Sequence, residues 1–170
     1  MSAVDLTLEL TLEAGTWEQL GDLEGLCARA AEAALVVAGV EGLVSLQLLL
    51  TDDAAIREIN REWRNLDKPT DVLSFPAAPA PGHPGPRPLG DVVLAFETLA
   101  RDAREEGKPL ADHAAHLLAH GVLHCLGYDH DTDEAAEEME ALETRAMALI
   151  GVPDPYAGSA HPGTPPSGTP

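Results

Sequence analysis

The sequence has few cysteines and no long apolar segment. Cys27 and Cys125 are the only cysteines in 170 residues, and neither belongs to a Cys-x-x-Cys pair, so a disulfide framework is not expected. No run approaches the roughly 18 consecutive apolar residues of a transmembrane helix. Residues 1–12 also lack the basic start and apolar stretch of a signal peptide. These absences predict a cytoplasmic protein that has no role at a membrane.

Positive charge is also scarce. Ten Lys and Arg residues face 29 Asp and Glu residues, which gives a formal net charge of −19 at pH 7. An acidic protein repels polyanions over long range, and phosphate binding usually depends on Lys and Arg. Four of the ten basic residues lie between positions 57 and 68, however, so this segment can bind an anion. The excess of acids also has a simpler explanation, a solvated surface that improves solubility.

The pattern of apolar residues predicts one α+β domain over residues 1–156. Strands are expected where apolar residues alternate or form short runs, and helices where they recur every three or four positions. The strands are predicted at 4–12, 44–50, 72–75 and 91–95. The helices are predicted at about 17–37 after a Thr16 cap, 53–63, 97–106, 109–126 and 133–150. Because strands come early and helices late, we expect a small mixed four-stranded sheet packed with about five helices.

Two segments are too rich in proline and small residues to belong to the core. Residues 76–88 hold six of the fourteen prolines, so a Pro-rich surface loop is expected over 77–88. From Ala157 to Pro170 the chain is dominated by Gly, Pro, Ser and Thr, so a disordered tail is expected over 157–170.

Three histidines near the C-terminus have the spacing of metal ligands. His120 and His124 are four residues apart, which places their Cβ atoms about 5–6 Å apart on one face of a helix. Two ring nitrogens can then reach one metal ion at about 2.0–2.1 Å. Gly127 can adopt the left-handed conformation that ends a helix, and the chain can return His130 to the same ion. Three histidines with an open fourth position are typical of a catalytic site, and one Zn²⁺ ion is the expected cofactor.

The helix that carries these ligands has a wider stripe of histidines. His113 and His116 share an arc of about 80° with His120 and His124, and the opposite side is apolar. Such a helix is expected to be buried, with its histidine face lining a cleft. His113 and His116 are either cleft residues or hydrogen-bonded core histidines. Asp129 is either an acceptor that orients an imidazole or a turn residue.

The glutamate that zinc peptidases use is missing. Peptidases with the H-E-x-x-H motif carry a glutamate as general base directly after the first histidine. Here this position is Gly121, although the spacing of His120, His124 and His130 is the one found in metzincins. A zinc metallopeptidase-like hydrolase therefore remains an alternative, but a reaction that depends on the metal and a cation fits better.

Residues 64–75 form a second unusual stretch, a charged loop that leads into a short strand. Arg64, at the end of a predicted helix, can present several N–H donors to phosphate oxygens, so it is a candidate catalytic residue. Ser74 is a candidate cleft residue on the same stretch. The simpler alternative is a surface loop with an ion pair between Asp67 and Lys68 that contributes little.

Both stretches resemble the YbeY family of bacterial rRNA-maturation endoribonucleases. Residues 120–130 match the family pattern H-G-x-L-H-L-x-G-Y-D-H, with Cys125 where leucine is usual. Residues 63–76 are similar to the element Y-R-x-x-D-K-P-T-[ND]-V-L-S-F-P, with Trp63 in place of tyrosine. Further similar segments are found at 89–92 and 138–143, and the resemblance covers roughly residues 44–156.

The resemblance implies a metal-dependent single-strand endoribonuclease. It implies zinc bound by His120, His124 and His130, and a functional role for Arg64. The expected role is 3′-end maturation of 16S rRNA and ribosome quality control. The expected partners are rRNA in the small ribosomal subunit, a small-subunit ribosomal protein and an assembly GTPase. Two further alternatives stay open, a zinc hydrolase of small molecules and a ribosome-assembly factor whose metal is structural.

Overall fold

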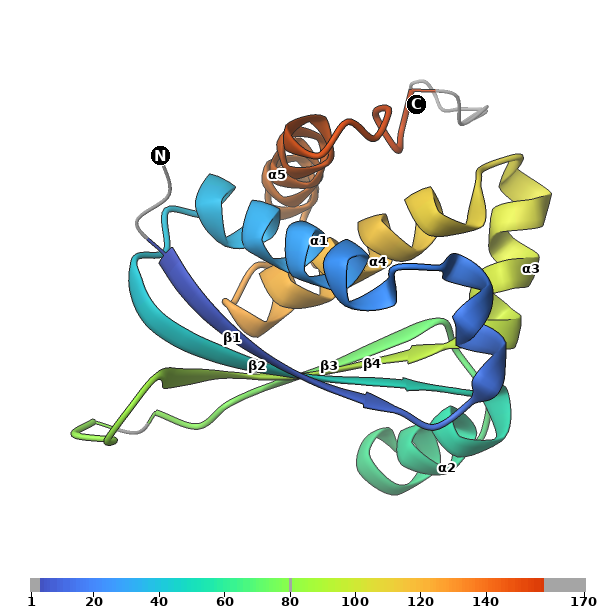
Figure 1. The fold of residues 1–170 in the computed structure, drawn as a ribbon, viewed down its shortest axis with the longest axis horizontal. Helices are drawn as coiled ribbons and strands as arrows, with labels where there is room; N and C mark the ends of the chain where they lie inside the picture. Colours follow the sequence, from blue (N-terminus) through green and yellow to red (C-terminus); the bar gives the residue numbers. More distant parts are fainter. Residues whose placement is uncertain (1–3, 80, 158–170) are drawn as a thin grey trace.

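The computed structural model describes residues 4–79 and 81–157, so the predicted tail lies outside the described residues except for Ala157. One sheet of four strands carries helices on both of its faces (Figure 1). The strands are β1 (Val4–Leu12), β2 (Gly42–Thr51), β3 (Val72–Pro76) and β4 (Arg87–Ala95). The helices are η1 (Gly15–Leu20), α1 (Leu23–Val37), α2 (Asp53–Arg64), α3 (Phe96–Glu106), α4 (Leu110–Cys125) and α5 (Asp133–Leu149).

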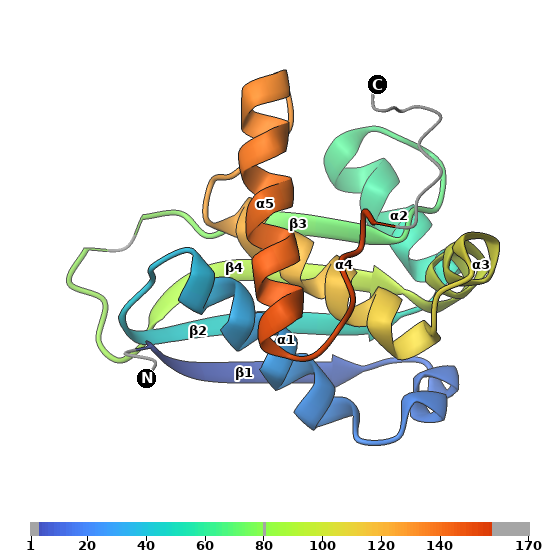
Figure 2. The ribbon, with the colours of Figure 1, turned by 90° about the horizontal axis from the view of Figure 1, so that it is seen from above.

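The sheet is mixed and four-stranded, which confirms the prediction, and its strand order is β1-β2-β4-β3 (Figure 2). β1 is parallel to β2 and β2 is parallel to β4, whereas β3 is antiparallel to β4. Parallel neighbours need a long crossover connection, and α1 lies in the connection between β1 and β2. Apart from η1, strands and helices follow one another along the chain in the predicted order.

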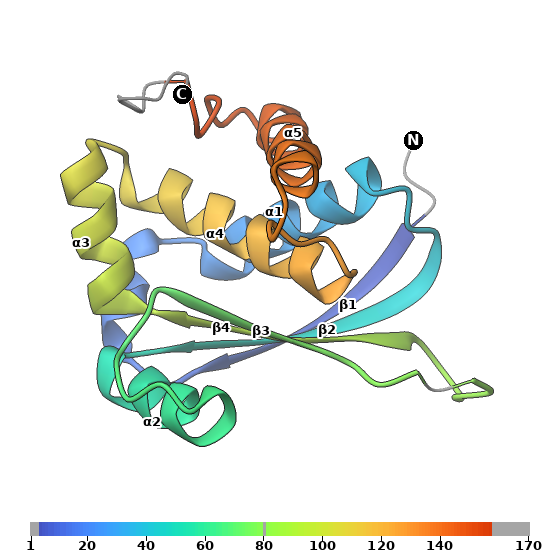
Figure 3. The same cartoon turned by 180° about the vertical axis from the view of Figure 1, so that it is seen from behind.

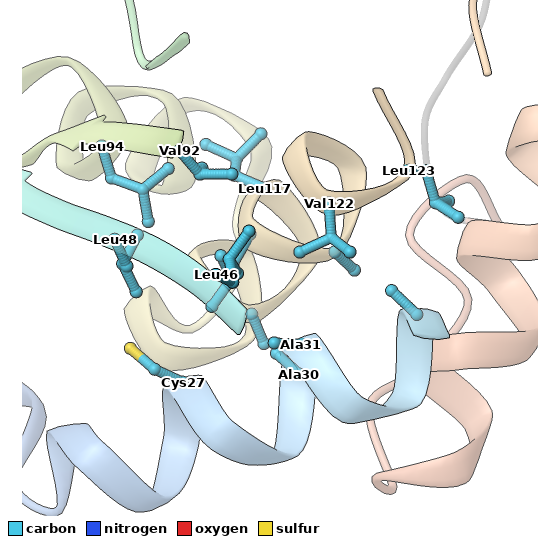
Figure 4. Packing of buried hydrophobic residues seen from close by; sticks show 14 of the residues in the cluster. Cys27, Ala30, Ala31, Leu46, Leu48, Val92, Leu94, Leu117, Val122 and Leu123 are labelled. Carbon is cyan, nitrogen blue, oxygen red and sulfur yellow. The ribbon is translucent and has the colours of Figure 1, made fainter. Parts of the chain in front are cut away.

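The helices form layers on the sheet. α1 and α4 lie on one face, α5 packs against both of them from outside, and α2 lies on the opposite face (Figure 1, Figure 3). Apolar side chains of β2 and β4, such as Leu46 and Leu94, meet those of α1 and α4, such as Ala30 and Val122, in the main core (Figure 4). This packing holds the histidine-bearing helix against the sheet. In the described part of the chain, no helix has the length and apolar character needed to cross a membrane.

The predicted start of the first helix is wrong. Thr16 does not cap a helix that runs on to residue 37; the chain forms the short 3₁₀ helix η1 instead. Trp17 is fully buried there, and its indole N–H donates to the carbonyl oxygen of Thr51 at 2.8 Å. Gly21 then adopts a φ of 74°, and the Asp22 side chain caps α1. The long-range contact of one aromatic residue thus overrides the local helical pattern.

β4 begins at Arg87, so the Pro-rich loop is shorter than the predicted range of 77–88. Pro88 is tolerated because it lies beside an irregularity in the pairing of β4 with β2. Gly90 has a φ of 146°, and a Cβ there would collide with the carbonyl oxygen of Phe75. Glycine is therefore required where β3 and β4 begin to pair.

The buried face of α5 is mostly apolar. Met139, Leu142 and Ala146 are buried, but Leu149, at the same helical spacing, is 58% exposed. Glu143 is buried instead, with a relative exposure of 1%. An acid in the middle of an apolar helix face needs partners, and they lie on α4 and in the segment after α5.

Candidate active site

The close approach of α4 to the sheet depends on Gly121. A Cβ at this position would lie 2.8 Å from Cγ1 of Val92 and 3.1 Å from Oγ of Ser74, so a larger residue would push the helix away from β3 and β4. A glutamate here, as in a zinc peptidase, would enter this packed interface. Gly121 therefore allows close packing of α4 on the sheet, and it also leaves this position without a general base.

A cleft of about 800 Å³ lies between the C-terminal half of α4, the turn after it, β3 and the end of α2. It brings together residues that are far apart in the sequence. Six residues predicted from the sequence line it: Arg64, Ser74, His120, His124, Asp129 and His130. His116, predicted to be either a cleft residue or a hydrogen-bonded core histidine, is not among the lining residues and is 9% exposed.

The three imidazoles meet at one end of this cleft. One ring nitrogen from each of His120, His124 and His130 lies within 4.8 Å of the others. The Nε2 atoms of His120 and His124 are 3.1 Å apart. Ligand atoms at about 2.0–2.1 Å from a tetrahedral ion lie about 3.3–3.4 Å apart. The α4 pair therefore already has nearly the separation that one metal ion requires.

Hydrogen bonds fix which nitrogen carries a proton in His120 and in His124. Nδ1 of His124 donates to the carbonyl oxygen of Tyr128 at 2.9 Å, and Nδ1 of His120 donates to Glu143 at 2.8 Å. Burial, followed by the nearby rings of His120 and His130, lowers the pKa of His124 and keeps it neutral. Both Nε2 atoms thus present lone pairs to each other, an arrangement that a cation between them would stabilise. The donor set fits a metal ion.

The turn after α4 positions the third histidine. Gly127 has a φ of 102°, and the N–H groups of Gly127 and Tyr128 donate to the carbonyl oxygens of His124 and Leu123 at 3.0 and 3.1 Å. These two bonds form a Schellman helix end, as the glycine predicted.

Asp129 acts in the turn rather than on an imidazole. Its Oδ1 accepts from the backbone N–H of His130 at 2.7 Å, whereas the distance from Oδ1 to Nδ1 of His130 is 3.9 Å. This second distance is too long for a hydrogen bond. The turn interpretation of Asp129 therefore agrees with the geometry.

Glu143 is a site residue that we did not identify from the sequence. Its carboxylate accepts from Nδ1 of His120, from Nε2 of His116 and from the Tyr156 hydroxyl. Burial raises the pKa of this carboxyl, but the hydrogen bonds from His116, His120 and Tyr156 outweigh burial and lower it to about 2. An ionised carboxylate can only accept, so it orients the His120 ring with Nε2 toward the cleft. An acid between the buried Met139 and Met147 was the available signal.

His116 belongs to this buried network behind the cleft. Its Nε2 is hydrogen-bonded to Glu143, and its ring packs edge-on against Tyr156 at a centroid distance of 5.5 Å. Of the two interpretations, the hydrogen-bonded core histidine therefore agrees with the structure. Its ring also lies edge-on to the His120 ring at a centroid distance of 6.4 Å, so His116 contacts His120 directly as well as through Glu143.

Arg64 reaches the same cleft from α2. It is the last residue of that helix, and Asn65 follows in the left-handed conformation with a φ of 61°. One Nη2 hydrogen of Arg64 is donated to the carbonyl oxygen of Ser74 at 2.7 Å, and the guanidinium lies 5.3 Å from the ring centroid of Phe75. This hydrogen bond uses one of the five N–H donors of the guanidinium. The geometry holds a planar cation over the cleft with further donors for an anion.

The predicted ion pair between Asp67 and Lys68 is not the one that the structure shows. Asp67 accepts from Nε of Arg57 at 2.8 Å, and both side chains are about half exposed, at 55% and 54%. Such an exposed pair contributes little to stability. Lys68 lines the cleft together with Arg64, so two cations face the histidines.

Comparison with known proteins identifies the family. The family model described as Endoribonuclease YbeY matches residues 14–151. Endoribonuclease YbeY of Bradyrhizobium sp. strain BTAi1 is 49% identical over 156 residues, which cover 89% of this chain and 92% of the relative. Endoribonuclease YbeY of Paramagnetospirillum magneticum is 49% identical over 158 residues, which cover 90% and 96%.

A solved structure has the same fold. The solution structure of TM1509 from Thermotoga maritima superposes with a TM-score of 0.53 at 24% sequence identity, covering 85% of this chain and 91% of that chain. The matches also begin well upstream of residue 44, where the resemblance in the sequence motifs starts. The family model and the relatives show that this chain belongs to the YbeY family of endoribonucleases.

Proposed function

We propose that this protein is a zinc-dependent single-strand endoribonuclease that acts in 3′-end maturation of 16S rRNA and in ribosome quality control. The observation that carries the proposal is the cleft in which three imidazoles and the Arg64 guanidinium face the same space. A three-histidine site keeps a coordination position open for chemistry. A guanidinium beside it suits a phosphate rather than an uncharged peptide bond.

Each residue of the site has a defined task in this proposal. His120, His124 and His130 hold the zinc ion, and Glu143 keeps the His120 ring in the ligand orientation. Zinc bound there would supply an activated water nucleophile at neutral pH. Arg64 donates to the phosphoryl oxygens and stabilises the negative charge that builds on them during cleavage.

The surroundings of Arg64 support a single-stranded substrate. Trp63 is 70% exposed and contacts the Phe75 ring edge-on at a centroid distance of 6.5 Å. Exposed aromatic rings beside cations are the surfaces on which unpaired bases stack. Bases in a duplex are already stacked and cannot use such a surface.

The strong negative charge supports a role for partners. The chain carries a formal net charge of −19 at pH 7. The electrostatic field of so acidic a protein opposes the approach of RNA over long range. Cations gathered in the cleft act only at short range, since salt screens charges beyond about 8–10 Å. A small-subunit ribosomal protein and an assembly GTPase would bring the enzyme to rRNA and supply the missing affinity.

A metallopeptidase is the second candidate, because the histidine spacing is the one found in metzincins. The packing of Gly121 argues against it, since position 121 faces Val92 and Ser74 in the sheet. No acidic base can therefore be placed there without displacing α4.

Substrate choice tests the proposal. We expect the purified zinc-loaded protein to cut a single-stranded 16S rRNA fragment with a 3′ extension, to leave the same fragment intact when it is paired with a complementary strand, and to leave casein intact. A zinc chelator should abolish the cleavage. Casein hydrolysis without RNA cleavage would favour the peptidase. Inactivity on all three substrates, together with normal ribosome assembly by His124→Ala, would favour an assembly factor with a structural metal.

Replacing Glu143 should weaken zinc binding without removing a ligand. Glu143→Gln keeps the shape of the side chain but removes its negative charge and one of its two acceptor oxygens, so it can no longer accept from both His120 and His116 in the same way. We therefore expect the zinc dissociation constant to rise by about 10–100-fold. Competition with a chromophoric chelator measures it. Glu137→Gln, on the exposed face of α5, removes the same charge and should bind zinc like the wild type. Equal affinity of the two variants would contradict the role given to Glu143.

A further inference from the structure

A second group of potential metal ligands lies at the other end of the α4 histidine stripe. Asp71 stands just before β3, Asp102 lies on α3 and His113 lies in the first turn of α4. One carboxylate oxygen of each acid and one ring nitrogen of His113 lie within 4.8 Å of one another. Three separate elements thus bring two acids and an imidazole to one point.

The buried imidazole has no partner of its own. His113 is 4% exposed, and neither of its ring nitrogens has a hydrogen-bond partner among the described residues. Leaving a buried polar group unpaired costs free energy, typically about 1–3 kcal/mol, and native proteins rarely do so. One of these nitrogens belongs to the group with the two carboxylates, so the imidazole is directed at them. A ligand between the three groups would satisfy it.

The positive charges nearby do not fill this role. Lys108 acts on His113 electrostatically, but its Nζ is already bound to Glu106 at 2.9 Å and to the carbonyl oxygen of Pro155 at 2.7 Å. Arg101 acts on Asp102 from the exposed side of α3. The space between the two acids and the imidazole is therefore left to a proton or to a metal ion.

We propose that Asp71, Asp102 and His113 bind one divalent metal ion of the manganese type, at a site distinct from the three-histidine centre. Carboxylates suit Mn²⁺, and one imidazole is compatible with it. Ligand atoms about 2.1–2.2 Å from one ion lie at most about 4.4 Å apart. Small rotations of the two aspartate side chains would therefore close the site.

The two metal ions would not act on one phosphate together. His113 and His120 are seven residues apart on α4, which corresponds to a rise of about 10.5 Å, whereas two-metal catalytic sites hold their ions about 3.5–4 Å apart. Asp71 lines the same cleft as Arg64. An ion on Asp71 and Asp102 would tie the start of β3 to α3 and α4 and would neutralise acids at the edge of the cleft.

Manganese binding to the full-length chain tests this site independently of RNA cleavage. The experiment uses the His124→Ala protein, in which the three-histidine centre is lost. Binding is measured as the decrease in the electron paramagnetic resonance signal of free Mn²⁺. We expect one Mn²⁺ per chain, and at least a tenfold weaker affinity once Asp102→Asn is added. Glu105→Gln, which removes an exposed charge from the same helix, should bind Mn²⁺ as the His124→Ala protein does.

Two outcomes would overturn the second site. One is the absence of Mn²⁺ binding at millimolar concentration, which would mean that the acids share only a proton. The other is Mn²⁺ binding that Asp102→Asn does not weaken. If Asp102→Asn fails to fold, as judged by circular dichroism, His113→Gln takes its place with the same expectation.

Discussion

Replacing Arg64 by alanine is expected to lower single-strand RNA cleavage by about 10²–10³-fold while the bound zinc stays in place. Arg64 lies over the cleft, and its guanidinium is held by the carbonyl oxygen of Ser74 and the ring of Phe75. It is therefore positioned before a substrate arrives, and in the proposed reaction its removal would take away donors at the point where negative charge develops. Single-turnover cleavage of a 3′-extended rRNA fragment, with zinc measured on the same sample, checks this.

Two further variants distinguish the effect of a positive charge on α2 from the effect of the position and planar shape of the Arg64 guanidinium. Arg61→Ala removes a cation from the same helix, but Arg61 is exposed and paired with Glu58 at 2.9 Å, so cleavage should stay close to the wild-type rate. Arg64→Lys keeps the charge and loses the planar fork, so its rate should fall between those of Arg64→Ala and the wild type. An Arg64→Ala protein that binds zinc and cleaves at the wild-type rate would refute the role given to Arg64.

Replacing His124 by alanine should have the largest effect, because in the proposed reaction it would remove both a zinc ligand and the nucleophile that the ion would supply. We expect tightly bound zinc to be lost and cleavage to fall by at least about 10³-fold, since the metal contributes several kcal/mol to the transition state. The measurement is zinc per chain after dialysis, followed by the cleavage rate. The experiment is best done with Asp102→Asn in both proteins, so that an ion at the second cluster does not enter the count.

The fold should survive this change. His124 is only partly buried, and its side chain contacts the turn at Tyr128 and the other imidazoles rather than the apolar core. Circular dichroism should therefore show a folded protein. If the His124→Ala protein retained one tightly bound zinc per chain, the three-histidine assignment would be wrong.

Features with a local cause could be predicted from the sequence. The i, i+4 spacing of His120 and His124, the helix end at Gly127 and the four strands follow from residue patterns that operate over a few positions. Arg64 is a candidate from the sequence because it stands at a helix end in a charged segment. The structure then shows these residues in one cleft, which no local pattern requires.

Features that depend on tertiary contacts could not be predicted in the same way. Glu143 meets His120 only because α5 packs on α4, and the partners are 23 positions apart in the sequence. The hydrogen bond from Trp17 to Thr51, 34 positions away, holds the segment before α1 in the 3₁₀ helix η1 instead of the predicted longer helix. Asp71, Asp102 and His113 form a cluster only once β3, α3 and α4 are packed. In the sequence, such residues can be recognised only because they are polar side chains at positions where burial is expected.

The zinc dependence of cleavage is measured most directly by titrating zinc into the metal-free protein and following single-turnover cleavage of the 3′-extended rRNA fragment at each point. We expect no cleavage without zinc, a rate that rises in proportion to zinc up to one ion per chain, and no rise beyond it. The same titration of the His124→Ala protein should give a flat line at the background rate. Cleavage by the folded metal-free protein at the wild-type rate would show that the three-histidine centre is not needed for the reaction.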